Sequence, residues 1–417
     1  MQIKRDRYLN KLIAQQNNGM IKIISGIRRC GKSYLLEVLF TSHLLANGVN
    51  SDHIINIRLD ELDDAKYRDP FVCNDFVKSK IQDKEQYYLM IDEVQLMDRF
   101  VEVLNGFLRI PNLDVYVTGS NSKFLSSDIV TEFRGRGSEI RVYPLSFAEF
   151  YSAVGGDWNL AWNQYYMYGG MPQVLNFKSD IEKRQYLKNL VKETYLKDII
   201  ERNKIKNVSE LEELLNILAS NIGGLTNTKK LADTFNSIKH LGISIPTVKQ
   251  YIDYFMDAFI ISKAMRYDIK GRKYINTPVK YYFADMGLRN AQLDFRQQEE
   301  NHIMENVLYN ELNICGYQVD VGNVTVSQKV KDNTYTKANL EVDFVANMGD
   351  KRCYVQSALN VNTAEKLVQE ERSLIGINDS FRKIIVVRDD IISYQTNNGT
   401  TIMSLKDFLL NSDSILV

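Results

Sequence analysis

The sequence predicts an α/β protein that starts with a parallel sheet carrying helices on both faces. Three short apolar runs, residues 20–25, 86–91 and 115–118, each stop at glycine or at acidic residues, as buried parallel strands commonly do. Beyond residue 150 the pattern changes to helices rich in aromatic, Leu and Lys residues, and strand-like runs return after residue 315. We therefore expect four segments along the chain: a sheet domain over 1–150, a helical linker or lid over 151–208, a helix-and-hairpin module over 209–290, and a second α/β domain over 291–417.

Length and composition fit a protein of several ordinary domains. At 417 residues the chain has room for about three domains of roughly 150 residues each. Hydrophobic residues make up 44% and charged residues 25%, which is enough apolar material for several cores. No apolar run reaches the roughly 20 residues that a membrane-spanning helix needs. The polar start at Met1 does not resemble a signal peptide, so we expect a cytoplasmic protein with no membrane partner.

The net charge excludes no class of partner, and the metal-ligating residues suggest no structural metal. Lys and Arg together number 52, as do Asp and Glu, so the total charge argues neither for nor against a nucleic-acid partner. The chain has four His and four Cys, and the cysteines lack the paired spacing of a zinc site or of a disulfide framework. They are Cys30, Cys73, Cys315 and Cys353.

A phosphate-binding loop directly follows the first predicted strand. Residues 26–33 read Gly-Ile-Arg-Arg-Cys-Gly-Lys-Ser, which fits the pattern G-x-x-x-x-G-K-[ST], and they lead into the helix-like run 34–40. In this strand–loop–helix context, backbone N–H groups surround phosphate oxygens. Lys32 would reach the β- and γ-phosphates of ATP, and the Ser33 hydroxyl would ligate Mg²⁺. The nucleotide-binding residues predicted from this Walker A motif are Gly26, Ile27, Arg28, Arg29, Cys30, Gly31, Lys32, Ser33 and Tyr34.

A second motif argues against a chance match on a glycine turn. The apolar run 86–91 ends at Asp92 and Glu93, which is a Walker B pattern. A buried parallel strand at this position would bring both carboxylates beside the loop. Asp92 would hold Mg²⁺ through water, and Glu93 would activate the attacking water as general base. Together the two motifs predict ATP and Mg²⁺ as cofactors and ATP hydrolysis as the reaction.

Polar residues after the third strand are candidates for two further roles. Ser120 and Asn121 would sense the γ-phosphate or position water, and the alternative is that they form a turn and a helix cap. Arg134 and Arg136 lie in the Gly-flanked run Phe-Arg-Gly-Arg-Gly. Because arginine stabilises charge on a transferring phosphoryl group, Arg136, or Arg134 in its place, would be the catalytic arginine, in cis or from a neighbouring subunit. The alternative for both is a solvated basic loop.

These motifs give residues 18–150 a resemblance to a known family, the bacterial and archaeal AAA-type P-loop ATPases that carry a C-terminal domain of unknown function. The matching runs are GIRRCGKS, LMIDEVQ, VTGSNS and FRGRG, followed by YPLSFAEF at 143–150 and YGGMP at 168–172. The resemblance extends over nearly the whole chain. It implies ATP binding, slow hydrolysis and a biological role that is mostly uncharacterised.

Residues 209–285 have the pattern of a winged helix-turn-helix. Helices are expected over 210–221, 227–235 and 244–252, and wing strands over 259–266 and 280–284. In DNA-binding versions the third helix enters the major groove, where this chain would offer Thr247, Lys249 and Gln250. The turn between the strands would contact phosphates through Lys270, Arg272 and Lys273. The alternative is a scaffold or a surface that binds a protein partner.

Residues 291–417 resemble a restriction-endonuclease-like α/β fold. A helix over 305–312, a strand over 318–321 and core strands over 340–346 and 352–358 fit that order. Active nucleases of this fold place a Glu on the helix, an Asp on the first core strand and an E-x-K motif on the second, which together hold Mg²⁺ and orient water. Glu311 and Asp343 match, but Gln356 replaces the Glu and Ala358 replaces the Lys. We therefore expect a catalytically degenerate domain without nuclease activity.

The main hypothesis is a Mg²⁺-dependent ATPase whose nucleotide state controls how its C-terminal modules meet a partner, either double-stranded DNA or a protein. One alternative is a nucleotide-gated interaction or signalling switch that involves no nucleic acid. Another is a DNA-processing enzyme with an active C-terminal nuclease, against which Gln356 and Ala358 argue. The sequence leaves open whether the protein is a monomer or a homo-oligomer.

Overall fold

The computed structural model describes residues 3–120, 135–239, 243–329 and 335–411. The chain divides into two compact units. Unit 1 consists of Met1–Pro144 with Met256–Ile260, and unit 2 of Leu145–Phe255 with Ile261–Val417. In the part of the chain that the structure describes, no helix is both long and apolar enough to cross a membrane.

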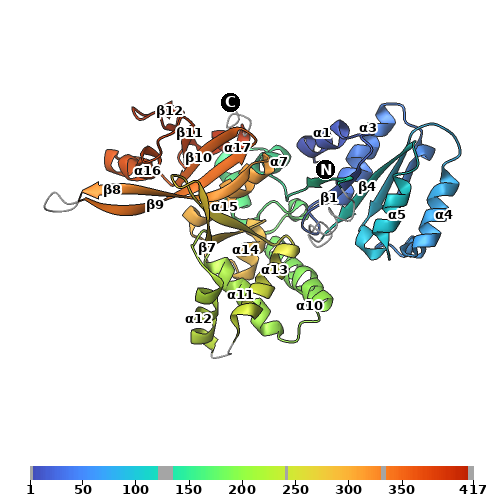
Figure 1. Ribbon diagram of the computed structural model, residues 1–417, viewed down its shortest axis with the longest axis horizontal. Coiled ribbons are helices and arrows are strands. Elements are labelled where there is room, and N and C mark those ends of the chain that lie inside the picture. The colour runs from blue at the N-terminus through green and yellow to red at the C-terminus, as the bar shows by residue number, and fades with distance from the viewer. Residues whose placement is uncertain (1–2, 121–134, 240–242, 330–334, 412–417) are drawn as a thin grey trace. The chain divides into compact units, whose positions relative to one another are not determined.

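Unit 1 is built on a five-stranded sheet in which every strand pair is parallel (Figure 1). The strand order is β2-β3-β4-β1-β5, so the strand that leads into the P-loop lies inside the sheet. The strands are β1 (Ile21–Ser25), β2 (Ile54–Arg58), β3 (Tyr87–Asp92), β4 (Leu113–Gly119) and β5 (Gly137–Arg141). The three apolar runs of the sequence correspond to β1, β3 and β4, which confirms the predicted parallel α/β fold.

Helices cover both faces of this sheet (Figure 1). On one face, alternate strand residues such as Ile23 and Val115 share a core with Val77 and Leu104 of helices α4 and α5. On the other face, the Phe40 ring packs on Tyr116 with the ring centroids 4.7 Å apart. The helices of unit 1 are α1 (Asp6–Ala14), α2 (Lys32–Tyr34), the π-helical η1 (Leu35–Phe40), α3 (Thr41–Ala46), the 3₁₀ turns η2 (Ser51–His53), η3 (Ala65–Arg68) and η4 (Val94–Leu96), α4 (Pro70–Lys80) and α5 (Phe100–Phe107).

A buried ion pair joins the two central strands. Lys22 on β1 is fully buried and bonds to the carboxylate of Asp114 on β4. The same carboxylate accepts hydrogen bonds from the Tyr116 hydroxyl, at 2.7 Å, and from the Asn17 backbone N–H, at 2.9 Å. Because a buried charge that loses its partner costs about 3–5 kcal/mol, this pair favours the observed pairing of β1 with β4.

Unit 2 begins with helices whose ends follow the family motifs. Ser146 in YPLSFAEF caps helix α7 (Phe147–Val154) and forms a capping box with Glu149. In YGGMP, the Gly170 N–H donates to the Asp285 carboxylate at 2.6 Å, and a Cβ at Gly169 would overlap that carboxylate. The glycines are therefore needed for close packing against the start of α14. The remaining helices are α8 (Trp158–Tyr168), η6 (Pro172–Asn176), α9 (Asp180–Asn189), η7 (Leu190–Leu196), α10 (Lys197–Asn203), α11 (Val208–Ser220), α12 (Thr228–Lys239), α13 (Ile245–Asp257), α14 (Met286–Gln292), α15 (Glu300–Ile314), α16 (Ala364–Ile375) and α17 (Leu405–Leu410).

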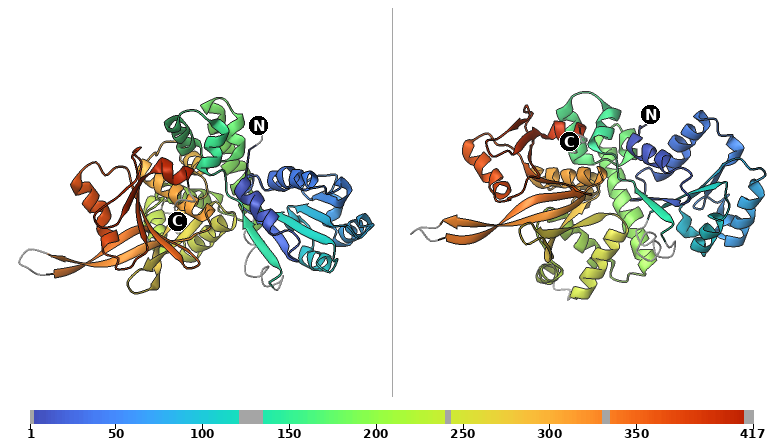
Figure 2. Two further views of the ribbon diagram at one scale, coloured as in Figure 1. Left: turned by 90° about the horizontal axis from the view of Figure 1, so that it is seen from above. Right: turned by 45° about the horizontal axis from the view of Figure 1, so that its top comes forward.

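A mixed eight-stranded sheet forms the rest of unit 2, in the order β12-β13-β11-β10-β9-β8-β6-β7. Pairs β10–β11, β11–β13 and β6–β8 are parallel, and the other pairs are antiparallel. The long β8–β9 hairpin, drawn in orange, extends away from the other strands of this sheet (Figure 2). The strands are β6 (Ile261–Asp268), β7 (Lys273–Phe283), β8 (Gln318–Lys329), β9 (Tyr335–Met348), β10 (Lys351–Ala358), β11 (Arg382–Val387), β12 (Tyr394–Gln395) and β13 (Thr401–Ser404).

The expected helix-and-hairpin module corresponds to helices α11, α12 and α13 and the β6–β7 hairpin. Thr226, before α12, also pairs with Val279 of β7 through two backbone hydrogen bonds of 2.8 Å. The hairpin is not a separate wing, because β6 pairs with β8 and so continues the C-terminal sheet. The sheet therefore crosses the predicted boundary at residue 290, and the division of this region into two domains stays a prediction.

Candidate nucleotide site

The loop between β1 and α2 has the backbone shape that a phosphate cradle requires. Gly26 and Gly31 have φ angles of 146° and 101°, which suit glycine, and Arg29 also has a positive φ of 65°. Lys32 begins α2, is only 4% exposed, and donates from Nζ to the carbonyl oxygens of Gly26 and Ile27 at 3.1 and 3.2 Å. The ammonium group therefore lies inside the curve of the loop, where phosphate oxygens would meet it.

Gly26 is required for a packing reason as well as a conformational one. A Cβ at this position would overlap the carbonyl oxygen of Val142, the residue that follows β5. The Val142 N–H in turn donates to the Ser25 carbonyl at 2.7 Å. The first glycine of the motif therefore allows the loop to pass close to the backbone of Val142 where it leaves β1.

The end of β3 lies directly beside the loop. The Ser33 hydroxyl donates to Oδ2 of Asp92 at 2.8 Å, and the Thr118 hydroxyl at the end of β4 bonds to Oδ1. Two predicted Mg²⁺ ligands, from segments far apart in the sequence, therefore touch. Burial raises the pKa of Asp92, while the hydrogen bonds from Thr118 and Ser33 act against that rise.

Glu93 is held in a fixed position next to Asp92. Its backbone has a positive φ of 51°, and its N–H donates to the Thr118 hydroxyl at 2.9 Å. The Glu93 carboxylate accepts a hydrogen bond from Ser120 at 3.0 Å and another from the Gln95 amide. The sequence prediction missed Thr118 and Gln95, although the position of Thr118 at a strand end before a glycine was a usable signal.

A buried arginine near the N-terminus contacts the loop from behind. Arg5, which is 2% exposed, donates to the carbonyl oxygens of Cys30 and Tyr143 at 3.1 and 2.7 Å. Cys30 itself is fully buried, and burial raises the pKa of its thiol. It is therefore an inert filler of the loop rather than a reactive thiolate. Arg5 was not among the residues expected from the sequence.

The other residues predicted for this site are exposed, bonded elsewhere or outside the described residues. Arg136 is exposed just before β5, and its carbonyl accepts from the Ile21 N–H at 2.8 Å. Arg28 is partly exposed and Arg29 is exposed, while the Tyr34 hydroxyl accepts from the Ile3 N–H at 3.2 Å. The predicted residues Asn121 and Arg134 lie outside the described residues.

Comparison with known proteins agrees with this geometry. Residues 18–151 match the family described as an AAA domain, and residues 159–299 match a domain of unknown function (DUF8612). An uncharacterized protein of Haemophilus influenzae is 31% identical over 390 residues, which cover 92% of this chain and 93% of that protein. The chain belongs to this family of AAA-domain proteins. The resemblance inferred from the sequence is confirmed.

More distant relatives have lower sequence identity to this chain. The uncharacterized protein MJ1544 of Methanocaldococcus jannaschii is 28% identical over 365 residues, covering 83% of this chain and 76% of its own length. Among solved structures, Aeropyrum pernix ORC1 in complex with DNA is 10% identical with a TM-score of 0.34, covering 70% of this chain and 93% of its own. Cdc6p from Pyrobaculum aerophilum is 11% identical with a TM-score of 0.30, covering 73% and 93%. Scores this low support no conclusion about function.

In unit 2, Asp343, one of the predicted nuclease-like residues, lies beside an ion-pair network. Lys280 of β7 bonds to Glu305 of α15 at 2.9 Å and to Glu341 of β9 at 2.7 Å. Asp343 accepts from the Ser357 N–H at 2.8 Å. Burial, reinforced by the charge of Glu305 and opposed by that of Lys280, raises the pKa of Asp343 well above its usual range.

The residues that interact in this network are not the set that the sequence predicted. The helix carboxylate that interacts with Asp343 is Glu305, whereas Glu311 is buried and accepts a weak contact from the Cys315 thiol at 3.9 Å. The Gln356 side chain accepts from the Asp343 backbone N–H at 3.2 Å. No cluster of three His, Cys, Asp or Glu side chains within the described ranges fits a metal ion.

The predicted DNA-contacting residues lie on two exposed elements of unit 2. Lys249 and Gln250 are exposed on α13, opposite the buried residues Val248, Tyr251, Ile252 and Phe255. Thr247 lies at the start of α13, where its N–H donates to the Ser244 hydroxyl at 3.2 Å. The turn residues Lys270, Arg272 and Lys273 are also exposed.

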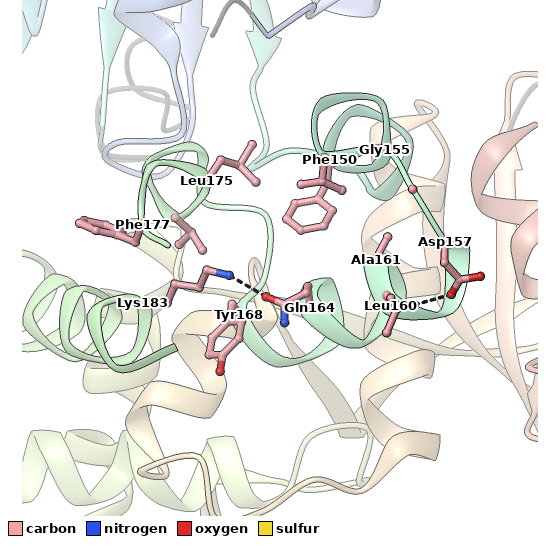
Figure 3. A pocket seen from close by; sticks show the side chains of 13 residues that line it. Phe150, Gly155, Asp157, Leu160, Ala161, Gln164, Tyr168, Leu175, Phe177 and Lys183 are labelled. Atoms are coloured by element: carbon pink, nitrogen blue, oxygen red, sulfur yellow. Dashed lines mark hydrogen bonds between the residues drawn. The ribbon is translucent and has the colours of Figure 1, made fainter. Parts of the chain in front are cut away.

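Unit 2 also contains an apolar hollow of about 330 Å³ among α7, α8, η6 and α9 (Figure 3). Phe150, Leu160 and Leu175 are among the apolar residues that line it. Its polar groups bind each other or the backbone: Lys183 donates to Gln164 at 2.7 Å, and Asp157 accepts from the Leu160 N–H at 3.0 Å. We assign the hollow no chemistry.

Proposed function

We propose that unit 1 binds ATP with Mg²⁺ and hydrolyses it. The observation that carries this proposal is the 2.8 Å contact between Ser33 and Asp92, which brings the loop and the acidic strand end together. Lys32 would neutralise charge on the β- and γ-phosphates, and the start of α2 and the loop N–H groups would hold their oxygens.

The oxygen ligands at this contact fit Mg²⁺. A hydroxyl and a carboxylate are the hard ligands that this ion prefers, with water completing its shell. When bound, Mg²⁺ would supply neutralisation of phosphate charge, with Ser33 as a direct ligand and Asp92 holding it through water. Thr118 would keep the Asp92 carboxylate aimed at the loop, because it bonds to the oxygen that Ser33 does not use.

Glu93 would act as the general base of hydrolysis. Its hydrogen bonds to Ser120 and Gln95 orient the carboxylate, and Thr118 fixes its backbone. In this position it would accept a proton from the attacking water. Arg136, or Arg134 in its place, would stabilise the charge that develops on the γ-phosphoryl group, from within the chain or from a neighbouring copy.

ATP binding is tested by measuring the affinity of the full chain for a fluorescent ATP analogue with and without Mg²⁺. Lys32→Ala should abolish measurable binding, because the main cation of the phosphate cradle is lost. Lys78→Ala, on the exposed side of α4, is the matched control and should bind as the wild type does. Absence of binding by the wild type, or equal binding by the Lys32 variant, would refute the proposal.

We further propose that the nucleotide state controls binding of double-stranded DNA by unit 2. The supporting observation is that α13 buries its apolar side and exposes Lys249 and Gln250, as a winged-helix recognition helix does. Duplex affinity should differ between the ATP-analogue and ADP states and should fall in Lys249→Glu. If no duplex binds in either state, this proposal is refuted, and a nucleotide-gated switch with a protein partner is the alternative to test.

A further inference from the structure

A second pocket of unit 2, of about 640 Å³, lies beside the turn that was expected to contact phosphates. It is bounded by the β6–β7 turn, the β9–β10 turn and residues 377–381, and we call it the turn pocket. Its lining includes Tyr267, Lys270, Arg272, Lys351, Arg352 and Phe381. None of them belongs to the ATP site of unit 1.

The turn pocket has an excess of positive charge. Four cationic side chains line it, Lys270, Arg272, Lys351 and Arg352, against two carboxylates, Asp350 and Asp379. The Asp379 carboxylate is already used inside the protein, because it accepts from the Tyr354 hydroxyl at 2.6 Å and from the Phe381 N–H at 3.2 Å. An anionic ligand would therefore be attracted to this pocket.

The cations are combined with aromatic rings. The Arg352 guanidinium lies 5.4 Å from the ring centroid of Tyr267 and 5.5 Å from that of Phe381. Its Nε donates to Asn347 at 2.6 Å, so the group is fixed in position. The Phe381 side chain is 38% exposed at the mouth of the pocket. A planar base can stack on such a surface while its phosphate meets the neighbouring cations.

We propose that the turn pocket binds single-stranded nucleic acid, with phosphates on Arg272 and Lys270 and an unstacked base against Phe381 and Arg352. A duplex presents only the edges of its bases, so it does not place a base face inside a pocket, whereas a single strand does. The inference shares with the proposed function only the use of a nucleic-acid partner by unit 2. It does not depend on ATP hydrolysis or on α13.

The test measures fluorescence anisotropy of the full chain with a labelled oligo-dT of about 20 nucleotides and with a duplex of equal length. Phe381→Ala should weaken binding of the single strand about tenfold, because one stacked base is lost. Arg272→Glu should weaken it similarly and reduce the dependence of affinity on salt concentration. Because Arg272 is exposed at the tip of the turn, this variant should keep the fold. Arg272→Lys should retain most of the affinity.

Lys206→Glu is the contrasting variant, since this exposed lysine of unit 2 does not line the turn pocket and its replacement should leave single-strand binding unchanged. ATP hydrolysis measured without DNA should be the same in all of these variants, which separates this inference from the activity of unit 1. The inference is wrong if both turn-pocket variants bind the single strand as the wild type does. It is also wrong if free AMP displaces the strand from the pocket at equal nucleotide concentration, which would make this a mononucleotide site.

Discussion

Replacing Thr118 by valine tests whether the Walker B carboxylates depend on one neighbouring hydroxyl. This hydroxyl bonds to Asp92 and accepts from the Glu93 N–H, and valine keeps the side-chain shape while removing both bonds. A hydrogen bond to an ionised group contributes about 1.5–3 kcal/mol, and a buried N–H without an acceptor costs about 1–3 kcal/mol. If about 2 kcal/mol of this loss appears in the activation barrier, kcat falls about 30-fold.

The assay is steady-state ATP hydrolysis with the ATP affinity measured in parallel. Thr118→Val should lose activity but bind ATP nearly as tightly as the wild type, because Lys32 and the loop are unchanged. Thr118→Ser keeps the hydroxyl and should retain most of the activity. Hydrolysis by Thr118→Val at the wild-type rate would refute the reasoning, as would equal losses in the serine and valine variants.

Three further predictions concern the support of the site and the stability of the chain. Arg5→Met removes the guanidinium that donates to two backbone carbonyl oxygens around the loop. The affinity for ATP should therefore fall about tenfold in a titration with labelled ATP, while kcat changes less. Gly26→Ala forces a methyl group into the Val142 carbonyl and should destabilise unit 1 by about 3 kcal/mol or more in denaturant titrations, whereas Gly106→Ala, which has open space on α5, should not. Burial raises the pKa of Asp285 from 3.8 to about 6, so the folded chain keeps a proton that the unfolded chain has already released. The stability that this proton contributes is complete below about pH 4 and is lost as the pH rises through about 6. Between about pH 4 and pH 7 the free energy of unfolding of the wild type should therefore fall by up to about 3 kcal/mol relative to that of Asp285→Asn. Equal pH dependence of the two proteins in denaturant titrations would contradict this.

The geometry of the candidate site around the loop was largely predictable because its signals are local. The loop from Gly26 to Ser33 specifies its own turn, and an apolar run that ends in Asp92 and Glu93 specifies a strand end. Parallel strands then bring the two together without further information. What the sequence did not reveal is the support from distant residues. A strand end such as that of Thr118 can be recognised, but a hydroxyl or a guanidinium has no sequence signature for the partner that it will meet. Thr118 and Arg5 are the two examples.

In unit 2 the elements were predictable and their pairing was not. The predicted helices between 209 and 257 match α11 to α13 within a few residues, since each depends on its own periodicity. Strands β7, β8 and β9 are longer than predicted, and α14 was not predicted. The β6–β8 pairing joins Arg266 to Val321, and no local pattern specifies such a register. For the same reason the sequence showed a missing lysine at Ala358 but not that Lys280, from another strand, lies among the carboxylates of that site.

The central claim is tested most directly by a single-turnover measurement of ATP hydrolysis with Glu93→Gln beside the wild type. The glutamine keeps the size and the hydrogen-bonding shape of the side chain but cannot accept the proton of the attacking water. The account predicts that the wild type hydrolyses bound ATP in a Mg²⁺-dependent reaction, while the variant binds ATP and retains it unhydrolysed. Hydrolysis by the variant at the wild-type rate, or a wild type that binds ATP without ever hydrolysing it, would contradict the account.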